Sequence, residues 1–326
     1  MVGLRYKDMQ NKPKEMVAMT TLTIDEFTFL VMPFEKSFQN YMSKWCFNGQ
    51  MRVGREYITY KNCPLSTTED RLLFALSYMK NNPLQTTHGL LFGLNQPKTS
   101  QWVNILLPVL RLTLAELGHA PSRTLEELAE RLGVSLTEAS DSFDIPSEAD
   151  DTELFCHDGT ERRIDRPQNE TEQRVCFSGK KKAHTLKNLL LINACLLILF
   201  LSDTYPGSVH DKRMADDTPY PLPRSSRLLQ DLGFLAFFLK GVESILPFKK
   251  PPKQALSPEQ LVYNQQLAAC RVYIEHVNSS VKRCRIVKDI CRLRLPGAKD
   301  AVMEIACSLH NFRISVHPWL PIPQSI

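Results

Sequence analysis

The chain lacks any Cys-x-x-Cys pair, although its 326 residues include nine cysteines. An odd number of scattered cysteines predicts neither a zinc ribbon nor a disulfide framework, and it favours a reducing compartment. The first twenty residues carry charges of both signs and no apolar segment, so we expect no signal peptide. The longest apolar run, residues 189–201, falls short of the roughly 20 residues that a membrane-spanning helix needs. We therefore expect no membrane partner.

The chain also has little excess of one charge over the other, because its formal net charge is only +5 at pH 7. Its distribution is uneven. Residues 270–299 contain eight Lys or Arg against two acids, whereas residues 141–153 contain six acids and no base. A basic block indicates a polyanionic partner such as nucleic acid. The acidic stretch has no helical pattern, and it indicates a linker over residues 136–153.

Helical periodicity fills much of the first 135 residues. In the N-terminal segment, residues 1–64, Thr23-Ile-Asp-Glu26 starts a helix that Pro33 would bend or divide. Three helices follow from Ser66, with a turn at 95–98 before the third. They are either a helix-turn-helix DNA-binding domain over residues 65–135 or an ordinary three-helix core. In the first case, the residues that would meet DNA are Lys98, Ser100, Gln101 and Asn104.

After residue 153 the pattern changes to short apolar runs that are typical of strands. Strands are expected at 154–158, 185–192, 196–201 and 227–231, and a helix is expected to begin at Asp211 after the turn Pro206-Gly-Ser. Strands and helices in this order predict an α/β domain over residues 154–315, followed by a short tail, 316–326.

The segment 267–285 combines two features of one predicted helix. Apolar residues spaced three and four apart form one stripe that would be buried: Leu267, Cys270, Ile274, Val277, Val281 and Cys284. Arg271, Glu275 and Lys282 share a second face. Taken alone, that face is either an exposed ion pair contributing a few tenths of a kcal/mol or one carboxylate of a metal and phosphate site.

Five ordered blocks resemble those of DDE-type transposases from bacterial insertion sequences and, more loosely, of their Harbinger relatives. The blocks are Asp158-Gly-Thr-Glu161, Phe177-Ser-Gly-Lys-Lys-Lys-Ala-His184-Thr, Pro206-Gly-Ser-Val-His-Asp211, Asp231-Leu-Gly-Phe234 and Arg271-x3-Glu275-x6-Lys282. The resemblance covers roughly residues 65–315. It implies an RNase H-like catalytic domain, a mixed sheet flanked by helices, preceded by an all-α helix-turn-helix domain.

The resemblance implies a transposase that cuts and joins DNA with two divalent ions, Mg²⁺ or Mn²⁺. It implies Asp158, Asp231 and Glu275 as catalytic metal ligands, since carboxylates that share a site need cations and oxygen donors suit these ions. Asp211 is the alternative second ligand, because its block is equally distinctive. The order of the fold favours Asp231, since it follows a strand, whereas Asp211 at a helix start could be a cap.

The partners implied are double-stranded DNA, as terminal inverted repeats and as target, and a second copy of the chain in a homodimer or larger synaptic assembly. The location implied is the bacterial cytoplasm, near the nucleoid. Phosphate contacts are expected from Arg271 and Lys282 and, from a turn beside the active edge, from Lys180, Lys181, Lys182 and His184. The alternative for that turn is a solvated run of charge.

Two other functions stay open at this stage. One is a catalytically inactive or domesticated DNA-binding protein derived from a transposase. The other is an RNase H-like nuclease that cuts DNA without strand transfer.

Overall fold

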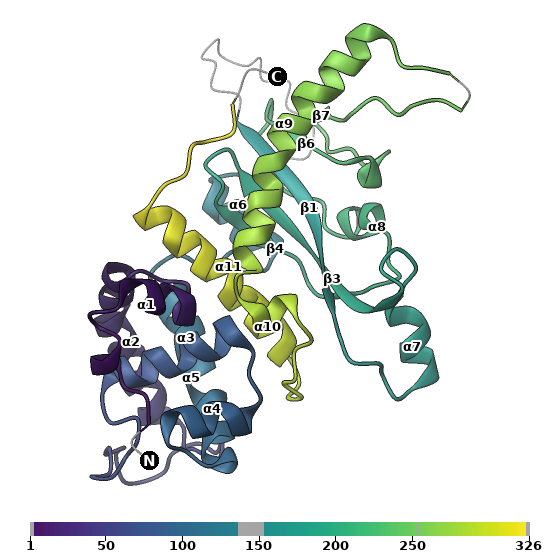
Figure 1. The fold of residues 1–326 in the computed structure, drawn as a ribbon. Helices are drawn as coiled ribbons and strands as arrows, with labels where there is room; N and C mark the ends of the chain where they lie inside the picture. The colour runs from purple at the N-terminus through teal and green to yellow at the C-terminus, as the bar shows by residue number, and fades with distance from the viewer. Residues whose placement is uncertain (1–2, 136–152, 253, 324–326) are drawn as a thin grey trace. The chain divides into compact units, whose positions relative to one another are not determined.

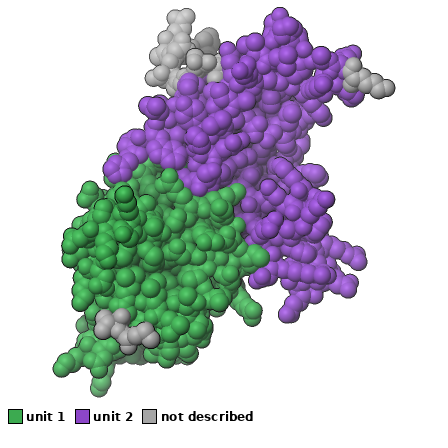
Figure 2. Space-filling view, viewed as in Figure 1, with its two compact units in different colours: residues 1–120, 281–316 green, residues 121–280, 317–326 purple. Residues whose placement is uncertain are grey.

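The structure, a computed structural model, describes residues 3–135, 153–252 and 254–323, so nearly all of the predicted acidic linker lies outside the described residues. The chain forms two structural units, which Figure 2 shows in different colours. The first contains residues 1–120 and 281–316, and the second contains residues 121–280 and 317–326. These bounds differ from the predicted domains, because the helices that follow residue 281 pack with the N-terminal helices.

The first unit is helical, and α5 lies at its centre. Its elements in chain order are η1 (Tyr6–Asp8), α1 (Pro13–Thr20), α2 (Ile24–Lys44), α3 (Thr68–Asn81), α4 (Gln85–Phe92), α5 (Gln96–Glu116), α10 (Arg285–Lys288) and α11 (Ala298–Val316) (Figure 1). Helix α5 packs against α2, α3, α4 and α11. Apolar side chains are buried around most of it, which is typical of a core helix.

Helix α2 begins where the sequence predicts. The Thr23 hydroxyl accepts a hydrogen bond from the backbone N–H of Glu26, and the Glu26 carboxylate accepts one from the N–H of Thr23 at 2.7 Å. The helix runs unbroken past Pro33, so the proline does not divide it. Pro33 leaves the carbonyl of Phe29 without its helical donor. Because Phe29 is 57% exposed, water can donate a hydrogen bond to that carbonyl instead.

Candidate membrane segments are few among the described residues. No single described helix has the length and apolar composition to cross a bilayer, although α1 and α2, joined with a 56° bend, pass that test as a pair.

His88 lies in an aromatic cluster of the first unit. Its ring centroid lies 4.4 Å from that of Phe74, 5.2 Å from that of Tyr78 and 4.9 Å from that of Phe92. A ring nitrogen lies 3.1 Å from the carbonyl oxygen of Phe74. Burial lowers the pKa of His88 to about 4, although the bond to Phe74 opposes the shift. The ring is therefore neutral in the folded protein at pH 7.

This burial predicts that the first unit loses stability in mild acid. The pKa of His88 is about 4 in the fold and 6.5 when unperturbed, so the unfolded chain binds the proton first as the pH falls. The contribution of His88 to the free energy of unfolding has its full value above pH 6.5. Below that pH it declines by up to about 1.4 kcal/mol per pH unit. Urea denaturation between pH 6.5 and 5, where most carboxylates stay ionised, measures this slope. In His88→Gln the free energy of unfolding should depend less steeply on pH over this range. An unchanged slope would contradict the prediction.

The second unit is built on one mixed sheet. Its elements are α6 (Leu125–Leu132), β1 (Leu154–Arg163), α7 (Glu170–Cys176), β2 (Phe177–Ser178), β3 (Ala183–Asn193), β4 (Ile198–Leu201), β5 (Tyr205–Pro206), α8 (Asp211–Asp216), β6 (Arg227–Leu229), η2 (Leu232–Phe234), β7 (Glu243–Ile245) and α9 (Pro258–Val281). The strand order is β2-β3-β1-β6-β7, and β4 and β5 also pair with β3. Strand β1 is antiparallel to β3 and parallel to β6. This mixed sheet flanked by helices is consistent with the RNase H-like domain predicted.

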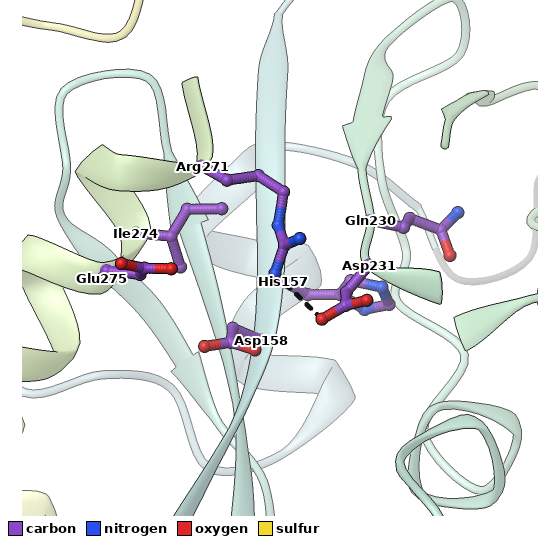
Figure 3. A pocket seen from close by; sticks show the side chains of 7 residues that line it. All are labelled: His157, Asp158, Gln230, Asp231, Arg271, Ile274 and Glu275. Atoms are coloured by element: carbon purple, nitrogen blue, oxygen red, sulfur yellow. Dashed lines mark hydrogen bonds and ion pairs between the residues drawn. The ribbon is translucent and has the colours of Figure 1, made fainter. Parts of the chain in front are cut away.

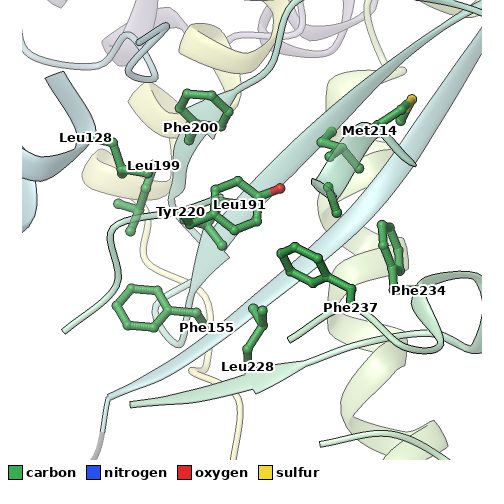
Figure 4. Packing of buried hydrophobic residues seen from close by; sticks show 12 residues of the cluster. Leu128, Phe155, Leu191, Leu199, Phe200, Met214, Tyr220, Leu228, Phe234 and Phe237 are labelled. Atoms are coloured by element: carbon green, nitrogen blue, oxygen red, sulfur yellow. The ribbon is translucent and has the colours of Figure 1, made fainter. Parts of the chain in front are cut away.

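The two faces of β1 have different neighbours, because successive side chains of a strand point to opposite sides. Phe155 belongs to an apolar cluster with residues of α6, α8 and η2 (Figure 4). Cys156 and Asp158 face the other side, where the long helix α9 crosses the sheet (Figure 1). The apolar stripe predicted on α9 is buried, which confirms it as the docking face: Leu267, Cys270, Ile274 and Val277.

Gly207 lies where three of the sequence blocks come into contact, those that contain Gly207, Thr185 and Glu161. A Cβ atom at this position would lie 2.0 Å from Oγ1 of Thr185 and 2.8 Å from the carbonyl oxygen of Cys176. The Thr185 hydroxyl in turn donates to the Glu161 carboxylate at 2.6 Å. The backbones of the turn and of β3 therefore approach as closely as they do because residue 207 has no side chain.

We therefore expect Gly207→Ala to destabilise the second unit by about 1–3 kcal/mol, since the new methyl overlaps Thr185 and a backbone carbonyl. Gly179→Ala is the matched control, because no atom lies within 4 Å of a Cβ there. The control should stay within about 0.5 kcal/mol of the wild type. Urea midpoints measure both, and equal midpoints for the two variants would show that the contact at Gly207 is not a constraint.

Candidate active site

Three acidic side chains from three elements line one pocket of the second unit (Figure 3). Asp158 projects from β1, Asp231 follows β6 and caps η2, and Glu275 lies on α9. Strands β1 and β6 are parallel, and Cys156 pairs with Leu229. Each of the two aspartates lies two residues beyond that pair, so the register brings both to the same place on the sheet. The predicted ligands Asp158, Asp231 and Glu275 therefore meet in one pocket.

Asp158 lies in the middle of a strand, and not near its end as the sequence suggested. The expected strand stopped at residue 158, but β1 continues to Arg163 and pairs with β3 along its length. The polar run Gly159-Thr-Glu161 hid this continuation, because it lacks the apolar residues by which a strand is recognised. The longer strand fixes the backbone on both sides of Asp158.

The surroundings of Asp158 make its ionised form more costly than in water. Burial raises the pKa of Asp158 to about 6; Arg271 opposes the rise, and Asp231 and Asp211 add to it. Asn278 donates a hydrogen bond from Nδ2 to Oδ2 of Asp158 at 2.6 Å. A half-buried carboxylate next to other acids is a group whose ionised form a bound cation would stabilise.

Asn278 is a residue of the site that the sequence analysis missed. It lies three residues after Glu275 and seven after Arg271, so the three side chains share one face of α9. That spacing was the available signal. An amide on the same stripe as an acid and a base was not distinguishable, without the fold, from an ordinary surface residue.

Arg271 lies between the helix and the second acid. Its Nη2 is 2.9 Å from Oδ2 of Asp231, and Figure 3 shows the guanidinium reaching across the pocket. The side chains of Arg271 and Asp231 are 32% and 40% exposed, so the pair contributes no more than about 1 kcal/mol. In this structure Arg271 pairs with a carboxylate, and its contact with DNA phosphate stays a prediction.

Asp211 lies on the opposite face of the sheet from Asp158. A Cβ at Gly159 would be 3.2 Å from its Oδ1, and a Cβ at Gly233 would be 3.4 Å from its Oδ2. Its carboxylate thus occupies the space beside both glycines, which neighbour the two catalytic aspartates in sequence. Lys187 binds Asp211 Oδ1 at 3.1 Å. Asp211 is not among the described residues that line the pocket.

The basic turn lies farther from the pocket than predicted. Lys180, Lys181 and Lys182 are exposed between β2 and β3. Asp158 pairs with Leu190 in β3, and this position is six residues from His184. Six residues of strand span about 20 Å, so the turn does not lie beside Asp158. The sequence could not show this, because the apolar run that follows the turn did not reveal its register with β1.

Lys282 lies one residue past the end of α9, whereas the spacing predicted it within the helix; its position on the face of Glu275 stays a prediction. Helix α9 ends at Val281, and Lys282 lies in the turn that follows it. Asn278-Ser-Ser before the end are weak helix formers, so the helix stops a turn earlier than its apolar spacing indicated.

The four residues predicted to read DNA lie on the first turns of α5. Lys98 and Asn104 are exposed, whereas Ser100 and Gln101 are half-buried. The turn before α5 is Gly93-Leu-Asn95, because Asn95 caps the helix by accepting from the N–H of Lys98 at 3.0 Å. This is earlier than the turn predicted at 95–98. A short turn containing glycine is compatible with a helix-turn-helix, which stays a prediction.

The pocket has the donor atoms that a hard divalent ion binds. Asp158, Asp231 and Glu275 offer only oxygen, which suits Mg²⁺ or Mn²⁺. Within residues 3–135, 153–252 and 254–323, no three His, Cys, Asp or Glu side chains are close enough together to hold one ion. Ion binding by all three carboxylates would therefore require them to draw closer together.

Comparison with known proteins agrees with the resemblance found in the motifs. Residues 157–311 match the sequence profile of the DDE superfamily endonucleases, so this segment is similar to the endonuclease domain of that superfamily. The chain is 31% identical over 141 residues to a protein of Microchaete diplosiphon described as "Probable transposase for insertion sequence element IS702". That match covers 43% of this chain and 50% of the relative. No solved structure gives a significant match.

Proposed function

We propose that the protein is a transposase that binds the ends of its own element and catalyses metal-dependent cleavage and transfer of DNA strands. One observation carries the proposal: the pocket in which Asp158, Asp231 and Glu275 meet lies inside the segment that matches the DDE endonucleases. The whole chain spans more than that domain, so its substrate and its partners are part of the proposal.

In this proposal Asp158, Asp231 and Glu275 hold two divalent ions, Mg²⁺ or Mn²⁺. Such ions, when bound, activate water and later a 3′-hydroxyl for attack on phosphorus and stabilise the leaving 3′ oxygen. Asn278 fixes the orientation of the Asp158 carboxylate from α9. Arg271 keeps Asp231 turned into the pocket and becomes available to a DNA phosphate when the pair opens.

Asp211 acts as a positioning residue in the same proposal. Its carboxylate packs against Gly159 and Gly233, and Lys187 offsets its charge from β3. It thereby braces the backbone beside the first and the second catalytic aspartate, from the face of the sheet opposite the pocket.

DNA would extend from the pocket over the basic residues. Successive phosphates of one strand are spaced about 3.4 Å along the duplex axis. If that axis follows β3, the residues about 20 Å from Asp158 would meet phosphates about six nucleotides from the cut: Lys180, Lys181, Lys182 and His184. The start of α5, with Lys98, Ser100, Gln101 and Asn104, would read the terminal repeats, and Lys282 would add a phosphate contact.

Joining two ends requires two active sites, which favours a homodimer or a larger assembly.

The test uses the DNA that flanks the gene. Sequencing should show inverted repeats, and a labelled duplex carrying them should be cut at its 3′ ends and joined to target DNA in Mg²⁺ but not in EDTA. Cut ends without joined product would indicate an RNase H-like nuclease. Binding without any nick in Mg²⁺ or Mn²⁺ would indicate a non-catalytic DNA-binding protein. A chain that neither binds nor cuts this duplex would refute the proposal.

A further inference from the structure

The helical unit contains a second cavity, in a part of the chain that precedes the endonuclease domain. Its volume is about 780 Å³, which falls within the roughly 300–1,000 Å³ of small-molecule sites. It lies between the start of α5 and the segment 45–60 that follows α2. The lining residues are Cys46, Phe47, Arg52, Arg55, Glu56, Tyr57, Ile58, Tyr60, Lys98, Gln101 and Trp102.

Aromatic rings form one part of the lining. Phe47 packs edge-on against Trp102 with ring centroids 4.8 Å apart, and lies 6.0 Å from the ring of Tyr57. Tyr60 is 47% exposed at the same cavity. Rings that are fixed by one another, with an accessible tyrosine beside them, offer a stacking surface for a planar group.

Two polar atoms of the lining lack a partner. The hydroxyl of Tyr57 and Oε1 of Gln101 are buried, and neither has a hydrogen-bond partner among the described residues. An unsatisfied buried polar group costs about 1–3 kcal/mol. Because both groups line the same cavity, a ligand with polar edge atoms would satisfy them, since the amide oxygen accepts and the hydroxyl can donate or accept.

The charge of the cavity favours an anion. Arg55 and Lys98 are exposed at its edge. Arg52 is held in place by the carbonyl oxygens of Met42 at 2.6 Å and Trp45 at 3.2 Å. One acid, Glu56, opposes these three cations in the lining. The cavity thus combines a stacking surface, an unpaired acceptor and hydroxyl, and an excess of positive charge.

We propose that this cavity binds one unpaired nucleotide of DNA. The base stacks on the aromatic side chains, its polar edge bonds to Gln101 and Tyr57, and its phosphate lies between Arg55 and Lys98. The proposal rests on the proposed DNA binding and adds to it a site for a base that has left the duplex.

The test compares three labelled duplexes that differ at one position only: fully paired, with one unpaired thymine, or with an abasic residue. By fluorescence anisotropy the whole chain should bind the unpaired-thymine duplex on the order of tenfold more tightly than the abasic one, the difference that stacking of one base provides. Thymidine monophosphate is added as a competitor in a fourth measurement.

Two conservative variants separate a ligand role from a structural one. Tyr57→Phe and Gln101→Leu remove the unpartnered atoms, so they should abolish most of the preference for the unpaired thymine and leave the urea midpoint unchanged or higher. Lys98→Ala should weaken the binding of all three duplexes. Lys36→Ala, at an exposed position of α2, should leave the binding of all three unchanged.

Equal affinity for the unpaired and abasic duplexes would overturn the nucleotide site while leaving the proposed DNA binding intact. Displacement by thymidine monophosphate without any preference among duplexes would assign the cavity to a free nucleotide and overturn its role on DNA. A lowered urea midpoint in Tyr57→Phe and Gln101→Leu would give those atoms a structural role, against the proposal. Failure to bind any duplex would contradict the proposed function itself.

Discussion

Asp158→Asn should reduce DNA cleavage by about a thousandfold or more. The substitution keeps the shape of the side chain but removes the negative charge of one of the three side chains that would hold the proposed ions. Metal ions contribute several kcal/mol of transition-state stabilisation, and about 4 kcal/mol corresponds to a factor of a thousand. The initial rate of cleavage of an end-labelled duplex in Mg²⁺ measures the loss.

The fold should tolerate this change, which makes the result interpretable. Because burial raises the pKa of Asp158 to about 6, its carboxylate is still mostly ionised at pH 7 but carries a desolvation penalty in the folded chain, and a neutral amide removes that penalty. The urea midpoint should therefore be unchanged or higher. Asp165→Asn, at an exposed position of the same unit, is the matched control and should cut at the wild-type rate. A variant Asp158→Asn that cuts as well as this control would remove Asp158 from the mechanism.

The second large effect distinguishes Asp231 from Asp211. Asp231→Asn should lose cleavage by about a thousandfold with little change in stability, because Asp231 lines the pocket and its ion pair with Arg271 is exposed. Asp211→Asn should lose about tenfold to a hundredfold in cleavage. It should also destabilise the second unit by about 1–3 kcal/mol, since Lys187 is only 15% exposed and would lose its opposite charge, keeping only neutral acceptors such as the carbonyl oxygen of Val209 at 2.9 Å.

Combining Asp211→Asn with Lys187→Met tests the bracing role. If the lost stability comes from the unpaired ammonium, the double variant should recover part of it, which would appear as coupling between the two changes. Cleavage reduced in Asp211→Asn as severely as in Asp158→Asn, with normal stability and normal cleavage in Asp231→Asn, would make Asp211 the second ligand.

The sequence predicted those features of the second unit that depend on local pattern. Apolar runs located β3 and β4, the turn Pro206-Gly-Ser marked the start of α8, and three-four spacing identified the buried stripe of α9. The order of these elements and the resemblance to an RNase H-like fold placed Asp158 on one strand and Asp231 at the end of a neighbouring one. The parallel pairing of β1 with β6 then follows from topology, and it brings the two acids together.

Features that depend on register and on packing over long sequence distances could not be predicted. The face on which Asp211 lies follows from which side of β1 carries Gly159, and a shift of one residue would reverse it. The distance from Asp158 to the turn at Lys180 follows from the pairing of Asp158 with Leu190. The contribution of α10 and α11 to the helical unit involves residues far apart in the chain, for which local periodicity carries no signal.

The helix-turn-helix stays a prediction for the same reason. Its hydrophobic pattern is that of any three packed helices, and α5 buries residues against α11 as well as against α3 and α4. The cavity beside Gln101 was also beyond sequence reasoning, because the segment 45–60 has no regular pattern that would indicate its contact with α5.

Crystals of the protein grown with Mn²⁺ would test the central claim most directly, by anomalous diffraction at the manganese edge. Two manganese peaks roughly 4 Å apart, bound by Asp158, Asp231 and Glu275, are the expected result, with Arg271 released from Asp231. Peaks bound at Asp211 in place of Asp231 would change the second ligand. A crystal at saturating Mn²⁺ with no peak at any of the three carboxylates would contradict the proposed metal-dependent mechanism.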